Sequence, residues 1–494
     1  MKDAQLGEIL QAVQALTFAN PFGPERAALE SALLAKLGDF PGPISTHTVY
    51  HERFRRLLPW IAAADRELRR RASEKVLPAK WRERTAYFAF FALYHELAPD
   101  LDKIITDPAG NSSNNRALYR KVVDGVAARH GLIANATRRI WDQPEHLFAC
   151  YYQVRRAFHA IHHEIIGESQ PIQNLRARVW ESVFTQDMMS YQQWMYDAVG
   201  RFPTLILGPS GSGKELVARA LGLARFLPYD AKSGTFGDGS GSRFHPINLS
   251  ALSETLIESE LFGHCKGAFT GAFGDRPGLF SLASAYGSVF LDEIGEVNES
   301  TQVKLLRLLQ SGEFQAIGDN RPQHYTGKII AATHKDLAAE MEAGRFREDF
   351  YYRLCGDQVH TASLREILND KPDDLASSVR YICTKLIGAE GTMEVSERVL
   401  SDLQAHLPPN YPWPGNFREL EQAVRNCIVR GRYGPAGKKN APPPLESIYR
   451  NTEVSLQEWT RLYVKQAVRN HGSYRAAAQQ LGVDQRTVKK LSES

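Results

Sequence analysis

Residues 204–215 read Thr-Leu-Ile-Leu-Gly-Pro-Ser-Gly-Ser-Gly-Lys-Glu, and this stretch decides the fold of the middle of the chain. A short apolar strand runs into the pattern GxxxxGK, and a helix-forming segment follows. The glycines allow successive backbone N–H groups to cradle phosphates, while the helix N-terminus adds its positive end. An ordinary glycine-rich turn is the alternative, because Glu215 stands where Ser or Thr usually binds magnesium. The predicted nucleotide contacts are Gly208, Ser210, Gly211, Ser212, Gly213, Lys214 and Glu215.

A second apolar strand, residues 287–293 (Gly-Ser-Val-Phe-Leu-Asp-Glu), ends in two carboxylates. Asp292 is placed to order a water bound to Mg²⁺, and Glu293 to polarise the water that attacks the nucleotide. Such a pair alone is often the solvated start of a loop. Because it follows the phosphate loop by about eighty residues on a strand of the same alternating pattern, the two motifs together predict ATP hydrolysis with Mg²⁺.

Between these two motifs, residues 267–272 spell GAFTGA. Glycines at both ends allow the backbone to reverse sharply, so we expect Phe269 and Thr270 to point outward at the tip of a loop. Such a loop in an ATPase would press on a partner protein in a nucleotide-dependent way. The alternative is a glycine-rich turn with Phe269 packed in the core. The predicted contact residues are Gly267, Ala268, Phe269, Thr270, Gly271 and Ala272.

The rest of the chain divides around this region. Strands and helices alternate from residue 165 to about 332, which favours a parallel sheet with helices on its faces, an α/β fold. We expect a mostly helical N-terminal regulatory domain over 1–164, the α/β subdomain over 165–360, a helical lid over 361–432, a Pro-rich linker over 433–454 and a DNA-binding unit over 455–494.

Composition is that of an ordinary globular protein, with 43% hydrophobic and 23% charged residues in 494. The longest apolar run is too short to cross a bilayer and the N-terminus lacks a signal-peptide pattern, so we expect a cytoplasmic protein without a membrane partner. The five cysteines are scattered and never form CxxC, which argues against disulfides and zinc.

The net charge of +4 is concentrated at the C-terminus, where seven basic and three acidic residues lie between Leu456 and Ser494. Residues 473–488 read as a helix, a Gly482 turn and a second helix capped by Asp484. A basic helix-turn-helix predicts binding in a DNA major groove; a helical tail with a solvated basic face is the alternative. The second helix would present Gln485, Arg486, Thr487, Lys489 and Lys490 to DNA.

Residues from about 165 to 430 resemble the AAA+ domain of bacterial enhancer-binding proteins, the activators of sigma-54 RNA polymerase. The end of the chain is similar to their Fis-type helix-turn-helix. The motifs that carry the resemblance are Ile166-Gly-Glu-Ser169, GPSGSGKE, Glu258-Ser-Glu-Leu-Phe-Gly263, GAFTGA, FLDEIGE, Phe346-Arg-Glu-Asp-Phe-Tyr-Tyr-Arg-Leu354 and Trp413-Pro-Gly-Asn-Phe-Arg-Glu-Leu420. Two segments look longer than the family's spacing, near 178–200 and 230–243; the second is Gly/Ser-rich and reads as a surface insertion.

The resemblance also implies roles for single residues, and it implies a Glu after the loop lysine. Asn248 would hold Glu293 in check until the nucleotide state is right. Arg347 and Arg353 would be fingers that reach the ATP of a neighbouring subunit, although pairing with Glu348 or Asp349 on their own helix is the alternative. The resemblance places Thr333 and Arg418 at the nucleotide. Where the family has Ala-Thr-Asn, this chain has Ala332-Thr333-His334.

For residues 1–164 no family is recognised. The absence of an apolar strand leading to paired acidic residues argues against a phosphorylated receiver domain. His159, His162, His163 and Glu164 lie at helical spacing, and either a metal site or a helix with solvated histidines would give this pattern.

Taken together, the sequence predicts a transcription activator that binds upstream enhancer DNA, assembles from dimers into a hexameric ring, and uses ATP to remodel the closed promoter complex of the sigma-54 RNA polymerase holoenzyme. The main rival is an AAA+ remodelling ATPase that acts outside transcription. A DNA-binding repressor with a silent ATPase is the weaker rival, because Lys214, Asp292 and Glu293 are all present.

Overall fold

The computed structural model describes residues 1–38, 52–74, 77–78, 81–107, 112–134, 139–185, 188–239, 244–408, 410–431, 433, 456–471 and 473–493. The chain forms two compact units, Met1–Arg432 and Tyr433–Ser494. The predicted linker over 433–454 lies almost entirely outside the described residues. None of the helices in the described part of the chain combines the length and apolar character needed to span a bilayer.

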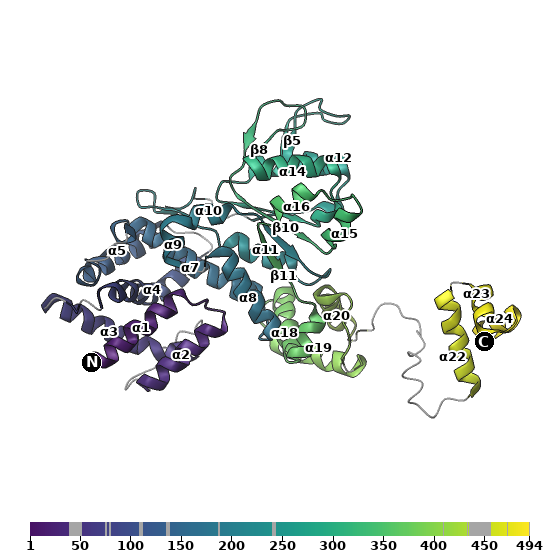
Figure 1. Ribbon diagram of the computed structural model, residues 1–494, viewed down its shortest axis with the longest axis horizontal. Helices are drawn as coiled ribbons and strands as arrows, with labels where there is room; N and C mark the ends of the chain where they lie inside the picture. Colours follow the sequence, from purple (N-terminus) through teal and green to yellow (C-terminus); the bar gives the residue numbers. More distant parts are fainter. Residues whose placement is uncertain are drawn as a thin grey trace. The chain divides into compact units, whose positions relative to one another are not determined.

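A five-stranded parallel sheet forms the centre of the first unit (Figure 1). Its strand order is β11-β1-β10-β7-β4, which differs from the order of the strands in the chain. Helices lie in the connections between successive strands, as parallel pairing requires. The strands are β1 (Thr204–Leu207), β4 (Phe244–Asn248), β7 (Ser288–Asp292), β10 (Lys328–Thr333) and β11 (Asp357–His360). The predicted α/β fold with a parallel sheet is confirmed.

Helices cover both faces of this sheet, because alternate side chains of each buried strand point to opposite faces. On one face Ile206, Phe290 and Ile330 pack against α8 (Gln170–Val183) and α11 (Lys214–Leu223). On the other face Leu205, Leu291 and Ala331 pack against the remaining helices. These helices are α12 (Glu254–Phe262), α13 (Leu279–Leu282), α14 (Glu299–Ser311), α15 (Leu337–Glu342) and α16 (Glu348–Leu354).

Two short hairpins extend from this face beyond α12 and α14 (Figure 1). They pair β5 (Gly263–His264) with β6 (Arg276–Pro277), and β8 (Glu313–Phe314) with β9 (Gln323–His324). A parallel bridge between His264 and Ile317 joins the two hairpins. Short 3₁₀ turns follow two of the sheet strands, η4 (Leu249–Ala251) after β4 and η5 (Ile294–Glu296) after β7.

The helical lid follows the sheet in the chain. It consists of α17 (Leu364–Asp370), α18 (Asp374–Ile387), α19 (Thr392–His406) and α20 (Asn416–Arg430). Ser363 begins α17 with a capping box, since its hydroxyl accepts from the Glu366 N–H while the Glu366 carboxylate accepts from the Ser363 N–H. Buried Asp374 accepts from the backbone N–H groups of Glu168 and Ser169, which fixes the start of the α/β subdomain to the lid.

The N-terminal part is mostly helical in its described residues, as predicted. Its elements are α1 (Asp3–Phe18), α2 (Pro24–Leu37), α3 (Glu52–Glu74), α4 (Arg82–Thr106), α5 (Ser112–Ala128), α6 (His130–Ile133), η2 (Arg139–Asp142) and α7 (Pro144–Glu164). Aromatic and aliphatic side chains of these helices form one core. Inside it Arg129 donates two hydrogen bonds to Asp65 at 3.0 and 2.8 Å, and the two side chains are only 2% and 5% exposed.

Both segments that looked long for the family contact the N-terminal helices. The hairpin of β2 (Tyr229–Asp230) and β3 (Thr235–Phe236) packs Phe236 flat against Tyr152, with ring centroids 3.9 Å apart. Its loop carbonyl at Gly234 accepts from Asn115 at 3.0 Å. The expected surface insertion is therefore part of the N-terminal core in its described residues.

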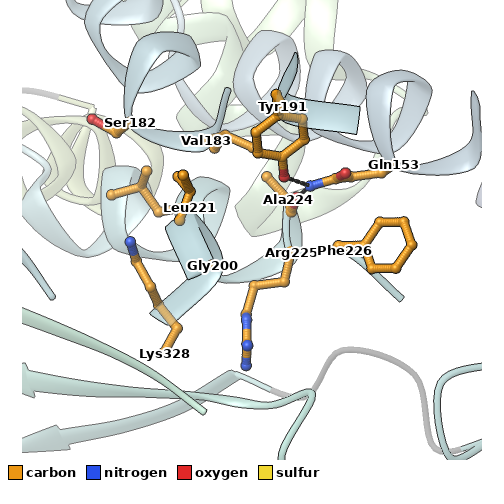
Figure 2. A pocket seen from close by; sticks show the side chains of 11 residues that line it. Gln153, Ser182, Val183, Tyr191, Gly200, Leu221, Ala224, Arg225, Phe226 and Lys328 are labelled. Carbon is orange, nitrogen blue, oxygen red and sulfur yellow. Dashed lines mark hydrogen bonds between the residues drawn. The ribbon is translucent and has the colours of Figure 1, made fainter. Parts of the chain in front are cut away.

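The other long segment contains α9 (Met188–Ser190), the π-helix η3 (Tyr191–Met195) and α10 (Tyr196–Arg201). The amide nitrogen of Gln153, on α7, donates to the Tyr191 hydroxyl at 2.7 Å and to the Ala224 carbonyl at 3.1 Å (Figure 2). Because Ala224 is the C-cap of α11, this amide ties the N-terminal domain to the helix that begins at the phosphate loop.

The described residues of the second unit form three helices, α22 (Leu456–His471), α23 (Tyr474–Leu481) and α24 (Gln485–Glu493). Ser473 caps α23 by accepting from the Ala476 N–H, and Gly482 turns the chain with φ 65°. Val464, Ala477 and Val488 form its small core.

The buried Arg129–Asp65 pair provides a test of the N-terminal core. Arg129→Met should destabilise this domain by about 3–5 kcal/mol, because Asp65 would be left as a buried charge without its main partner. Arg70→Met is the control: its ion pair with Glu74 is exposed, and its loss should cost no more than about 1 kcal/mol. Native-state hydrogen exchange of the α4 amides measures the opening free energy of each variant. Equal losses of opening free energy in the two variants would contradict the structural role of the Arg129–Asp65 pair.

Candidate functional site

The predicted phosphate loop lies between β1 and α11, at the carboxyl edge of the sheet. Gly208, Gly211 and Gly213 all have positive φ, at 154°, 74° and 89°, which a side chain would disfavour. A Cβ on Gly211 would lie 2.5 Å from the Gly415 carbonyl, so the lid approaches the loop too closely for any other residue. The ammonium of Lys214 donates to the carbonyls of Gly208 and Pro209 at 2.9 and 3.0 Å.

Charge at this edge is concentrated in a half-buried region. Burial lowers the pKa of Lys214, while Glu293 and Asp292 oppose that shift. Burial and the neighbouring Glu293 raise the pKa of Asp292, and Lys214 acts in the opposite direction. One cation facing two carboxylates is an arrangement that can accept a polyphosphate together with a divalent cation.

Asn248 contacts Asp292, not Glu293. Its amide nitrogen donates to the Asp292 carboxylate at 3.2 Å, and its oxygen accepts from the N–H and hydroxyl of Ser250. In this structure the Asn248 side chain therefore bonds to Asp292, and its role in holding Glu293 in check stays a prediction. The reason is strand register: β4 and β7 pair in parallel with Asn248 directly opposite Asp292. Glu293 lies one residue further on, after the strand has ended.

Glu293 is held by His334 instead. Its carboxylate accepts from His334 Nδ1 at 2.7 Å and from the His334 backbone N–H at 3.3 Å. Glu293 has left-handed backbone angles, φ 58° and ψ 49°, a conformation that costs a non-glycine residue about 1–3 kcal/mol. This turn brings the carboxylate to the end of β10, where buried Thr333 precedes His334. The residue that departs from the family pattern is therefore the partner of the predicted catalytic carboxylate.

The lid reaches the phosphate loop through the Trp-Pro-Gly-Asn motif. Arg418 donates to the Ser210 hydroxyl at 3.2 Å, which places this predicted nucleotide contact at the loop. Asn416 donates to the Ser210 carbonyl at 2.9 Å and accepts from the Leu364 N–H at 2.9 Å. Asn416 also has a positive φ of 52°. The lid and the loop are thus joined at one end of α20.

Two residues at this site were not predicted from the sequence, Asn416 and Thr361. The Thr361 hydroxyl lies 2.6 Å from the Ser212 hydroxyl and would clash with a Cβ on Gly208. Asn416 ends the Trp413-Pro-Gly-Asn motif and is the first residue of α20, so the motif was a usable signal for it. Thr361 follows β11, and only the pairing of β11 with β1 brings it to the loop.

The two predicted arginine fingers differ. Arg347 forms ion pairs with Asp349 at 2.9 Å and Glu299 at 3.1 Å, which agrees with the alternative of local pairing. Arg353 is exposed on α16 and makes no hydrogen bond or ion pair within the described residues. Arg353 is thus available to reach a second copy of the chain. Glu215 is exposed on the first turn of α11 and lies 3.8 Å from Arg219.

The GAFTGA residues form the loop between β5 and β6. Gly267 and Gly271 have φ of 83° and 105°, and the Gly267 N–H donates to the Ala272 carbonyl at 2.9 Å, which closes the loop. Thr270 is exposed as predicted. Phe269 is only half-buried and its ring meets His264 edge-on at 4.9 Å, so it lies between the two expected positions.

The most exposed aromatic of this region is Phe273, one residue beyond the motif, at 89%.

In the second unit all five predicted DNA contacts are exposed on α24, while Val488 between them is buried. Asp484 accepts from the Arg486 N–H at 2.7 Å and fixes the start of that helix. The five are Gln485, Arg486, Thr487, Lys489 and Lys490.

The histidine cluster on α7 does not form a metal site in the described residues, where no group of three possible ligands is found. His159 is buried and bonds to Asp102, which also accepts from Arg155 at 2.7 Å. His159 is therefore a structural residue of the N-terminal core.

The strand order, phosphate loop, acidic strand end and helical lid define an AAA+ ATPase domain. Residues 181–360 match the family model described as Sigma-54 interaction domain. This match lies within the part of the chain in which the sequence motifs resemble those of bacterial enhancer-binding proteins.

Curated relatives include the anaerobic nitric oxide reductase transcription regulator NorR of Salmonella agona (strain SL483), which is 37% identical over 313 residues, 58% of this chain and 57% of the relative. NorR of Escherichia coli O157:H7 (strain EC4115 / EHEC) is 35% identical over 310 residues with the same shares. The chain thus spans about half the length of these relatives. The crystal structure of NtrX from Brucella abortus in complex with ATP has a TM-score of 0.43 and 21% identity over 76% of this chain and 75% of that one.

The contact between Glu293 and His334 yields a testable expectation. His334→Ala should lower ATP turnover by about tenfold while ATP affinity stays within about twofold, because Glu293 would lose the side chain that orients it. His334→Asn should restore much of the turnover, since an amide can also donate. His324→Ala is the control, a 60% exposed histidine that lies 4.0 Å from Glu313. Normal turnover in His334→Ala would show that the contact has no part in catalysis.

Proposed function

We propose that this protein is a sigma-54-dependent transcription activator that hydrolyses ATP to remodel the closed promoter complex. The observation that carries the proposal is the position of the GAFTGA loop. It forms the end of a hairpin on the same domain that holds the phosphate loop, and this domain matches the Sigma-54 interaction model. The related NorR proteins are named transcription regulators, which supports a role in transcription.

Hydrolysis would use the residues at the carboxyl edge of the sheet. Lys214 and the backbone N–H groups of the loop would bind the phosphates of ATP. Asp292, kept in place by Asn248, would hold Mg²⁺ through a water; its half-buried carboxylate beside Lys214 fits that ion. The ion would neutralise charge on the phosphates. Glu293 would accept a proton from the attacking water, with His334 fixing its orientation.

A complete site would need a second protomer. Arg353 projects from α16 without a partner in the described part of its own chain, and a guanidinium neutralises charge that develops on phosphoryl oxygens. We propose that Arg353 reaches the ATP of a neighbouring subunit in a ring, formed from dimers up to a hexamer. Arg347 would first have to leave Asp349 and Glu299 to do the same.

Force would pass from the nucleotide to the polymerase through the two joined hairpins. Because the β8–β9 hairpin is bridged to β5 next to the GAFTGA loop, a shift of one hairpin would move the other. The exposed Thr270 would contact sigma-54, with Phe269 moving out from His264 to join it. The α24 helix would bind upstream enhancer DNA, in keeping with a cytoplasmic regulator.

The central test compares Glu293→Gln and Thr270→Ala in open-complex formation on a sigma-54 promoter with ATP. Glu293→Gln should bind ATP but lose turnover by at least about a hundredfold, because it lacks the base. Thr270→Ala should keep wild-type turnover yet fail to open the promoter. Thr326→Ala, an exposed threonine outside the loop, is the control and should behave as wild type. Normal promoter opening by Thr270→Ala would refute the assignment of the loop, while turnover without any effect on the polymerase would favour a remodelling ATPase outside transcription.

The composite site predicts complementation between two inactive variants. Arg353→Ala and Glu293→Gln should each lack turnover alone, since each removes one half of every site. Mixed rings would contain some sites with both intact residues, so mixing equal amounts should recover measurable ATP turnover. Absence of recovery, with mixed rings verified by differently tagged subunits, would place Arg353 outside the neighbouring site.

A further inference from the structure

A cavity of about 90 Å³ lies in the N-terminal domain and reaches the segment that leads into the ATPase sheet. One side is formed by α1, α2, α3, α4 and α7, and the other by Trp180 of α8 and Gln192 of η3. Neither the catalytic edge of the sheet nor the GAFTGA loop contributes to it.

Flat aromatic groups dominate the cavity wall. Phe54, Phe91 and Phe158 line it together with Trp180 and Tyr94. Their rings are held in place by other rings: Phe54 meets Phe91 edge-on at 6.0 Å. A flat aromatic molecule would stack on, or meet the edges of, these rings with better contact than an aliphatic one.

The charged groups of the wall are already paired. Arg26 donates to Glu30 at 2.8 Å and its guanidinium lies over the Phe54 ring at 5.0 Å. Arg155 is paired with Asp102. A charged ligand would lose its hydration in the cavity and would find no unpaired opposite charge among these groups. The wall therefore favours an uncharged ligand.

One polar group in the wall lacks a partner. Gln192 is only 1% exposed. Neither its side-chain amide nitrogen nor its side-chain amide oxygen has a hydrogen-bond partner among the described residues. A buried amide left unsatisfied costs about 1–3 kcal/mol, and native proteins rarely keep one without a reason. A ligand that both donates and accepts would satisfy both atoms.

We propose that this cavity binds a small, uncharged aromatic molecule whose polar substituent both donates and accepts hydrogen bonds, as a primary carboxamide does, and that Gln192 recognises this substituent. The proposal adds an input ligand to the proposed function and does not depend on the polymerase. Gln192 directly follows Tyr191, which Gln153 ties to the end of α11 (Figure 2). The ligand would thus bind one residue away from a link to the phosphate-loop helix.

The test is calorimetric titration of the full chain with benzamide at millimolar concentration. Benzamide should bind saturably, and at least tenfold more tightly than benzoate, which is charged, and cyclohexanecarboxamide, which is not flat. Gln192→Met should weaken benzamide binding at least tenfold. Gln193→Met, the adjacent residue outside the cavity wall, is the matched control and should bind as wild type.

A purely structural role for Gln192 is distinguished by stability. Without ligand, Gln192→Met should melt at the same temperature as wild type or higher, because it removes an unsatisfied buried amide. Val154→Phe, which fills part of the cavity, should abolish benzamide binding and serves if the first variant fails to fold. Lack of saturable benzamide binding by the wild-type chain, or equal binding by folded Gln192→Met and wild type, would overturn the proposal.

Discussion

The parallel pairing of β4, β7 and β10 is the constraint on which the catalytic edge depends. Parallel strands end at the same edge of a sheet, so residues far apart in sequence meet there. Register then decides which of them touch: Asn248 lies opposite Asp292, and Ala332 lies opposite Asp292 on the other side. The chain after β10 therefore turns its next side chain toward the residue after Asp292. The left-handed turn at Glu293 completes this arrangement by directing the carboxylate to His334.

Local motifs allowed much of the site to be predicted. The phosphate loop and the two carboxylates are contained in short stretches whose chemistry does not depend on distant residues. The contact of Asn248 with Asp292 was not predicted, because a one-residue difference along β7 is invisible without the strand pairing. The left-handed backbone of Glu293 and the Thr361 contact could not be read either, since both depend on tertiary structure. Phe269 was expected at a free tip, but His264 from the start of the same hairpin partly covers it.

Comparison with the family's usual spacing also indicated that two segments are long. It did not indicate that these segments join the N-terminal helices to the ATPase domain. The hairpin at 229–236 reads as polar because mostly small or polar residues, Asp-Ala-Lys-Ser-Gly-Thr, lie between its only two aromatic residues. Those two, Tyr229 and Phe236, enter the core formed by the N-terminal helices. The segment at 188–201 similarly supplies Tyr191 and Gln192 to the other side of the same junction. Both segments of the ATPase domain thus contact the N-terminal helices.

The hairpin of β2 and β3 has a consequence for attempts to produce the ATPase domain by itself. Tyr229 and Phe236 are covered by Phe148 and Tyr152, side chains that belong to the other module. Removing the first 164 residues would expose these two aromatic rings on the surface of the remaining ATPase domain. Such an exposed hydrophobic patch promotes aggregation. The N-terminal helices and the ATPase domain therefore cannot be separated without changing the hairpin as well.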